Sequence, residues 1–135
     1  MVCVYCGGQT RVTNSRLQRR NNQVWRRRRC LSCGAVFSTT EGAQLELAWQ
    51  VRRGKRLEPF SRDKLFLSLY RSCEHRKTAL SDAEGLCETV LRRLSAQLAG
   101  GVIDASDIVE VAQVALNRFD KAASVHYGAY HRRTA

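Results

Sequence analysis

The sequence predicts an α+β fold made of two parts, a small β-rich unit and a larger unit of short strands and helices. Residues 1–43 contain two Cys-x-x-Cys pairs and short β-like runs but no helical period. Helical patterns instead fill the chain after Pro59. A chain of 135 residues is long enough for two small domains. We therefore expect one domain over residues 1–43 and a second over residues 44–135.

Four cysteines dominate the first unit. Cys3-x-x-Cys6 and Cys30-x-x-Cys33 are separated by 23 residues, and a glycine follows each pair. A unit this small buries too little apolar surface to fold alone and needs a covalent or metal crosslink. Four thiolates in two such pairs bind tetrahedral Zn²⁺, so the spacing predicts a zinc ribbon. The alternatives are iron in a site of four sulfurs, or paired disulfides.

The charge of the chain favours a polyanionic partner. The net charge is +11, and residues 1–43 hold eight arginines against a single acid, Glu41. So much charge of one sign indicates nucleic acid, although a merely basic soluble protein is the simpler alternative. No apolar run approaches the ~20 residues that span a bilayer, and the N-terminus does not resemble a signal peptide. We therefore expect a cytoplasmic protein without a membrane partner.

The stretch "QVWRRRRC" is the strongest candidate for nucleic-acid contact. It reads as a strand, as does "TRVTNS", with Asn21-Asn22 as a turn between them. On a strand, Arg26 and Arg28 face one way and Arg27 and Arg29 the other. Guanidinium groups fit phosphates and guanine edges, so we expect one of these two pairs to contact DNA closely. A solvated basic face is the alternative.

Residues 44–60 read as extended structure with a basic turn. "LELAWQV" alternates in hydrophobicity, "RRGK" forms the turn, and Pro59 ends the extended piece. The turn places several basic side chains close to Glu58 and to Lys64 of the following helix. This arrangement predicts a phosphate site, although an exposed charged hairpin explains it about as well.

Helical patterns follow in two pairs. Ser61 predicts the N-cap of a helix over residues 61–76, and Ser81-x-x-Glu84 resembles a capping box that opens a helix over residues 81–98. Cys73 and Cys87 lie on apolar faces and lack metal-ligand spacing, so we expect buried thiols.

The second pair occupies the C-terminal third of the chain. A third helix is predicted over residues 106–119, and Asp120 predicts the cap of a fourth, with Val125, Ala129 and Tyr130 facing inward. No carboxylate pair and no Cys/His or Ser/His/Asp arrangement indicates catalysis, so we expect a protein that is not an enzyme.

Four motifs, taken in order, resemble those of the NrdR family, the bacterial transcriptional repressors of ribonucleotide reductase genes. The motifs are "CVYC", "RRRRCLSC", "VRRGKRLEPFSRDK" and "FDKAASVHYGAYHRR". The resemblance covers nearly the whole chain. It implies a zinc ribbon that binds DNA, followed by an ATP-cone domain. In that domain three short strands, two of them in a β-hairpin, accompany a four-helix bundle.

The resemblance also implies a function. The chain would be a repressor that binds double-stranded operator DNA of reductase genes in the bacterial cytoplasm, and it would lie on the nucleoid when bound. ATP and dATP would be regulatory ligands of the ATP-cone. They would change the homo-oligomeric state and thereby control DNA binding.

Carried over residue by residue, the resemblance assigns three sets of side chains. The Zn²⁺ ligands would be Cys3, Cys6, Cys30 and Cys33. The DNA-binding residues would be Arg11, Arg16, Arg26, Arg27, Arg28 and Arg29. The nucleotide-binding residues would be Val51, Arg52, Arg53, Lys55, Arg56, Glu58 and Lys64.

Several positions depart from the family pattern. The usual hairpin Lys-Arg-Asp-Gly is Arg-Arg-Gly-Lys here, which keeps the charge but changes the hydrogen-bond geometry of its first position. Ala105 replaces a small hydroxyl residue, Ser124 an aromatic one and His126 an arginine. These departures leave open a different nucleotide or operator preference.

Two other hypotheses fit the same residues. A constitutive zinc-ribbon module that binds nucleic acid, with a structural helical domain, predicts no change of mass with nucleotide. An accessory protein that docks on another machine through its second domain predicts no operator binding of its own.

Overall fold

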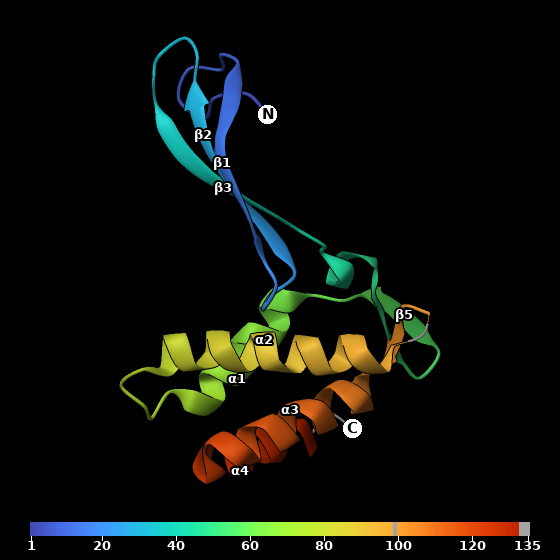
Figure 1. The fold of residues 1–135 in the computed structure, drawn as a ribbon. Coiled ribbons are helices and arrows are strands. Elements are labelled where there is room, and N and C mark those ends of the chain that lie inside the picture. The colour runs from blue at the N-terminus through green and yellow to red at the C-terminus, as the bar shows by residue number, and fades with distance from the viewer. Residues whose placement is uncertain (99, 133–135) are drawn as a thin grey trace. The chain divides into compact units, whose positions relative to one another are not determined.

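The computed structural model describes residues 1–98 and 100–132, and it divides the chain into two compact units, Met1–Gln44 and Leu45–Ala135 (Figure 1). The first unit consists of strands, and the second combines short strands with helices. This arrangement confirms the predicted α+β class. In the described part of the chain, no helix is long and apolar enough to cross a membrane.

The first unit is an antiparallel sheet of three strands. It contains β1 (Thr10–Gln18), β2 (Gln23–Cys30) and β3 (Val36–Gly42) in the order β1-β2-β3. Asn22 has a φ of 51° between β1 and β2, a left-handed conformation that asparagine tolerates well in tight turns. The first two strands match the predicted runs, but the sequence analysis did not predict β3.

A second small sheet opens the second unit. It contains β4 (Gln50–Arg53), β5 (Arg56–Pro59) and β6 (Val102–Asp104) in the order β5-β4-β6, with β4 parallel to β6. Gly54 has a φ of 60° in the basic turn that the sequence predicts. The prediction of extended structure is wrong for Leu45–Ala48, which form a 3₁₀ helix, η1. The next residue, Trp49, is buried and packs edge-on against Phe60 at 5.4 Å, and this tertiary contact outweighs the local strand pattern.

The described chain has four α-helices: α1 (Arg62–Cys73), α2 (Ala79–Gln97), α3 (Ala105–Phe119) and α4 (Lys121–Arg132). Ser61 caps α1 as predicted, since its hydroxyl accepts from the Lys64 amide at 3.3 Å. The helix ends at Cys73 rather than at residue 76. The predicted capping box is wrong, because α2 begins two residues before Ser81, whose hydroxyl donates to the Thr78 carbonyl.

The inward face of α4 also differs from the prediction. Val125 is 72% exposed and Tyr130 is 52% exposed, and Ala129 is exposed as well. The buried positions are instead Ala123, Ser124, Tyr127 and Gly128. The helical period of the prediction was right, but its phase was wrong by about half a turn, because Tyr127 and the small residues Ala123, Ser124 and Gly128 face the core instead of Val125, Ala129 and Tyr130.

Packing of α2 against α1 and α3, and of α4 against α1 and α3, forms the core of the second unit. Cys73 and Cys87 are fully buried there, as predicted, and burial raises the pKa of Cys87 to about 11. Beside this core, Arg76 donates to Asp82 at 2.8 Å and to Asp120 at 3.0 Å. This link ties the loop after α1 to the start of α2 and to the α3–α4 junction.

Candidate functional site

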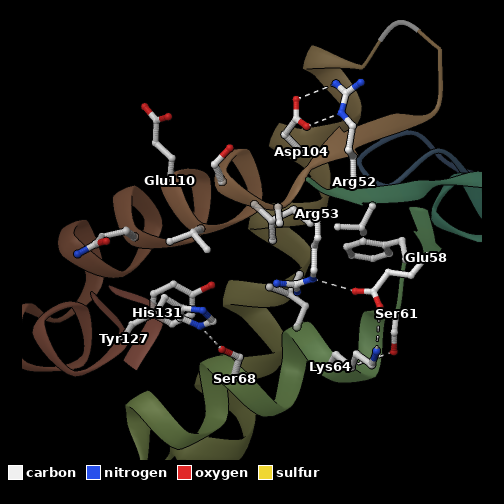
Figure 2. A pocket seen from close by; sticks show the side chains of 18 of the residues that line it. Arg52, Arg53, Glu58, Ser61, Lys64, Ser68, Asp104, Glu110, Tyr127 and His131 are labelled. Carbon is white, nitrogen blue, oxygen red and sulfur yellow. Dashed lines mark hydrogen bonds and ion pairs between the residues drawn. The ribbon is translucent and has the colours of Figure 1, made fainter. Parts of the chain in front are cut away.

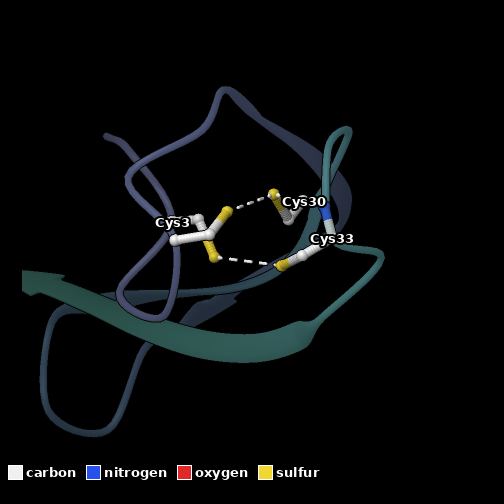
Figure 3. A group of neighbouring side chains, drawn as sticks. Cys3, Cys30 and Cys33 are labelled. Atoms are coloured by element: carbon white, nitrogen blue, oxygen red, sulfur yellow. Dashed lines mark hydrogen bonds between the residues drawn. The ribbon is translucent and has the colours of Figure 1, made fainter.

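The four cysteines of the first unit converge on one point. All four sulfur atoms lie within 4.8 Å of one another. The Cys3 and Cys33 sulfurs are 3.7 Å apart, and the Cys6 and Cys30 sulfurs are 3.5 Å apart (Figure 3). Ligands at about 2.3 Å in a tetrahedron are about 3.8 Å apart, whereas a disulfide requires about 2.05 Å. The geometry therefore fits a Zn²⁺ site and not the disulfide alternative.

Backbone amides donate hydrogen bonds to three of the four sulfurs, those of Cys3, Cys6 and Cys30. The Tyr5, Gly8 and Ser32 amides each donate to a cysteine sulfur at 3.4 Å. The Cys33 amide also donates to the Cys30 sulfur, and this contact is the main reason that the pKa of Cys30 falls to about 6. Gly7 and Gly34 bring the chain around each knuckle with φ values of 73° and 72°.

The arginines of β2 alternate in exposure as a strand requires. Arg26 and Arg28 are half-buried, whereas Arg27 and Arg29 are exposed. Arg26 forms an ion pair with Glu41, and Arg28 donates to the Thr39 hydroxyl at 3.2 Å.

The other pair has no such contact. Within residues 1–98 and 100–132, the guanidinium groups of Arg27 and Arg29 make no hydrogen bond or ion pair. The two pairs therefore differ chemically: the first pair is bound to β3, and the second is available to a partner.

A cavity of about 860 Å³ lies in the second unit, between the β4–β5 hairpin and helices α1, α3 and α4 (Figure 2). Of the residues assigned to nucleotide binding, those that line it are Val51, Arg52, Arg53, Glu58 and Lys64. Lys55 and Arg56 belong to the same hairpin but do not line the cavity.

Charged groups at the hairpin side of the cavity form two clusters, one of three groups around Glu58 and one pair at Asp104. Arg53 donates to Glu58 at 2.9 Å, and the Lys64 ammonium lies 4.0 Å from the same carboxylate. The Arg53 hydrogen bond and the Lys64 charge lower the pKa of Glu58. Arg52 makes a bidentate pair with Asp104 at 2.7 and 2.9 Å, which links the hairpin to the start of α3.

The opposite wall of the cavity comes from α3 and α4 and is mostly apolar. Tyr127 and His131 lie 4.2 Å apart between ring centroids, and the His131 ring is 2.8 Å from the Ser68 hydroxyl. Burial raises the pKa of Tyr127 to about 12 and lowers the pKa of His131. The sequence analysis missed this wall. The spacing of residues 127, 128 and 131 would have identified it if the phase of α4 had been right.

The departures from the family pattern fall in different places. Ala105 lines the cavity, whereas Ser124 is buried outside its lining and His126 is exposed. Ala105 therefore bears directly on what the cavity binds, as do the departing hairpin residues Arg52 and Gly54, which also line it.

Comparison with known proteins identifies relatives along most of the chain. The family described as "Transcriptional repressor NrdR-like, N-terminal domain" matches residues 1–41. A protein of Symbiobacterium thermophilum named "Transcriptional repressor NrdR" is 35% identical over 98% of this chain and 87% of its own length. Proteins of the same name in Syntrophus aciditrophicus and Thermus thermophilus are 34% and 36% identical over 98% of this chain, in each case covering 84% of the relative.

Proposed function

Because the chain belongs to the NrdR family of transcriptional repressors, we propose that it binds operator DNA of ribonucleotide reductase genes and releases or engages that DNA in response to ATP and dATP. The relatives are named repressors and not enzymes, and the chain is likewise a regulatory protein. The family and the cluster of four cysteines support Zn²⁺ in the ribbon. The ligands proposed for it are Cys3, Cys6, Cys30 and Cys33.

The observation that carries the DNA-binding proposal is the attachment of an arginine strand to the metal site. Cys30 is both the last residue of β2 and one of the four converging sulfurs. When bound, Zn²⁺ supplies a structural crosslink that holds this end of the strand. Arg27 and Arg29 then keep a fixed spacing and lose little conformational freedom on contact with phosphates. The proposed DNA-binding set is Arg11, Arg16, Arg26, Arg27, Arg28 and Arg29, with the exposed members making the closest contacts.

The nucleotide proposal rests on the charges of the cavity. A volume of about 860 Å³ lies in the range typical of small-molecule sites. Arg53 and Lys64 stand beside the capped N-terminus of α1, where phosphate is favoured by charge and by the helix dipole. Glu58 lies between these two cations and can accept from a ribose hydroxyl or a base amine.

Not every assigned residue has the same part in this proposal. Arg52 forms an ion pair with Asp104, so we assign it the role of holding the hairpin on α3 rather than of binding phosphate. Val51 is a buried wall residue of the same strand. Lys55 and Arg56 lie outside the cavity and would act only through long-range charge.

Control of DNA binding follows from a coupling free energy. If ATP and dATP favour different homo-oligomers, and only one oligomer presents its ribbons at the spacing of paired operator sites, then each nucleotide changes the affinity for DNA. The same coupling requires operator DNA to change the nucleotide affinity by the same factor. A symmetric oligomer also predicts repeated or palindromic half-sites.

Light scattering tests the proposed regulation. The molar mass is measured without ligand, with ATP and with dATP, and each measurement is repeated with operator DNA. We expect the mass to differ between the two nucleotides and only one form to bind DNA tightly. A mass that does not respond to nucleotide, together with unchanged DNA binding, would indicate a constitutive zinc-ribbon module instead. Nucleotide-dependent mass without DNA binding would indicate the accessory protein.

A further inference from the structure

We infer that a β-bulge at Thr13 brings Arg16 onto the same face of the ribbon sheet as Arg11, Arg27 and Arg29, and that this four-arginine face is the surface that contacts the DNA backbone. The inference rests on the proposed DNA-binding function and specifies which side of the sheet performs it. We call this surface the arginine face.

The register of β1 against β2 carries the inference. Arg11 lies opposite Arg29, and Val12 lies opposite Arg28. The next pair is Asn14 with Arg27, so Thr13 has no opposite residue on β2, and the register shifts by one residue at this point. Beyond the shift, Arg16 lies opposite Trp25. One strand thus contains an extra residue relative to the other, which defines a bulge.

The extra residue changes which face Arg16 occupies. Side chains alternate along a strand, and Arg11 and Arg16 are five positions apart, so a regular strand would place them on opposite faces. Directly opposed residues of an antiparallel pair share a face. Arg11 therefore shares a face with Arg29, and Arg16 shares one with Trp25. Trp25, Arg27 and Arg29 occupy every second position of β2 and therefore share a face. The side chains of Arg11 and Arg16 lie on this same face.

The two faces of the sheet differ in charge and in contacts. The partners of the arginine face on β3 are Val36, Ser38 and Thr40, none of which is acidic. The opposite face holds Arg26 and Arg28 with Glu41, the single acid of residues 1–43. The β3 residues on the opposite face are half-buried at Phe37 and Thr39, whereas their neighbours toward the arginine face are exposed. The sheet therefore concentrates uncompensated charge on its open side.

Thr13 itself stabilises the shift. Its hydroxyl donates to the carbonyl of Arg27 at 3.2 Å, across to the strand that carries two of the arginines. This bond gives the extra residue a polar partner and fixes the place where the register changes. The bulge is thus a positioning element, and Arg16 is the residue that it positions.

Moving one charge across the sheet tests the inference. The double variant Ser15→Arg/Arg16→Ser keeps the net charge but transfers the arginine to the opposite face, because Ser15 lies opposite Arg26. Arg16→Ala removes the charge altogether. Deletion of Thr13 leaves Arg11 and Arg16 four positions apart, so the ladder closes with the same cross-strand partners and the same arginine face.

The readout is the affinity for a labelled duplex of random sequence, measured by anisotropy over a range of salt. Arg16→Ala should weaken binding about three- to tenfold and make the slope of log K against log salt shallower by about 0.9, the value of one phosphate contact. The double variant should lose as much despite its full charge. The Thr13 deletion should bind within about twofold of the natural chain. Zinc content and far-ultraviolet circular dichroism verify the fold of each variant.

The outcomes separate the two levels of the proposal. Binding by the natural chain that does not depend on salt would overturn the DNA-binding function itself. Salt-dependent binding that is unchanged in the double variant would leave that function intact and overturn the arginine face, because net charge alone would then suffice. A Thr13 deletion that weakens binding as much as Arg16→Ala, or that fails to hold zinc, would overturn the role assigned to the bulge.

Discussion

Truncating the two arginine pairs of β2 separately gives the most detailed prediction. The variant Arg27→Ala/Arg29→Ala removes two exposed guanidinium groups that have no hydrogen-bond or ion-pair partner within residues 1–98 and 100–132. The variant Arg26→Ala/Arg28→Ala removes the same amount of charge from the neighbouring positions. It also removes the ion pair with Glu41 and the bond to Thr39. The two variants are therefore matched in net charge and differ in the face that they alter.

The expected magnitudes follow from the contacts. A hydrogen bond to a charged group contributes about 1.5 kcal/mol, so two lost phosphate contacts cost about 3 kcal/mol, or about 100-fold in Kd. The salt slope should become shallower by about 1.8. Loss of Arg26 and Arg28 should weaken DNA binding only about threefold, through the weaker long-range field. It should instead lower the melting temperature by a few degrees, since it removes two side-chain links between β2 and β3 while the backbone pairing of the strands remains.

Anisotropy titrations at several salt concentrations measure both quantities on one duplex, and thermal melts of the zinc-loaded chain measure the second effect. Equal losses of affinity in the two variants would show that net charge and not the face determines binding. A larger loss for Arg26→Ala/Arg28→Ala, with an unchanged melting temperature, would show that the opposite face contacts DNA.

Three further predictions concern the metal, the cavity and the loop after α1. Chelation of zinc should unfold residues 1–43 and abolish DNA binding, whereas nucleotide binding by the second unit, measured by calorimetry, should persist. Loss of both activities would contradict the assignment of DNA binding to the first unit and nucleotide binding to the second. Lys64→Ala should weaken ATP binding about tenfold, since it removes a cation from the cavity rim, whereas Lys55→Ala, outside the cavity, should change it less than twofold; similar effects would reject the site. The amide of Ala123, followed by His75 and Arg76, lowers the pKa of Asp120 to about 2 in the folded chain, against about 3.9 when unfolded. The ionised Asp120 carboxylate therefore stabilises the fold fully above about pH 4, and this stabilisation is lost as the pH falls toward 2. Asp120→Asn should lower the melting temperature at pH 7 by about 5 °C and reduce the difference between melting temperatures at pH 5 and pH 2.5. Near-ultraviolet circular dichroism of the second unit measures both.

The sequence predicted the features that depend on local chemistry. The spacing of the cysteines predicted the cluster of four sulfurs, and alternation along "RRRR" predicted two arginine pairs on opposite faces. Ser61 predicted a helix cap, and Gly54 predicted a turn. Each of these depends on residues close in the sequence or on a ligand geometry that leaves few alternatives.

The features that depend on contacts between distant residues were not predictable in this way. The 3₁₀ turn before Trp49 exists because the indole packs against Phe60, and the phase of α4 depends on which of its residues meet α1 and α3. The far wall of the cavity follows from that phase. The bulge at Thr13 escaped notice because strand alternation assumes a regular ladder, and only the cross-strand register reveals the extra residue.

The central claim is that a nucleotide in the second unit changes DNA binding by the first. The most direct test is the ratio of operator Kd values in saturating ATP and saturating dATP, measured for the natural chain and for Lys64→Ala at the same nucleotide concentrations. The account predicts a ratio of about tenfold or more for the natural chain, corresponding to a coupling of at least about 1.4 kcal/mol, and a ratio near one for the variant. A ratio near one for the natural chain, at nucleotide concentrations that calorimetry shows to be saturating, would contradict it.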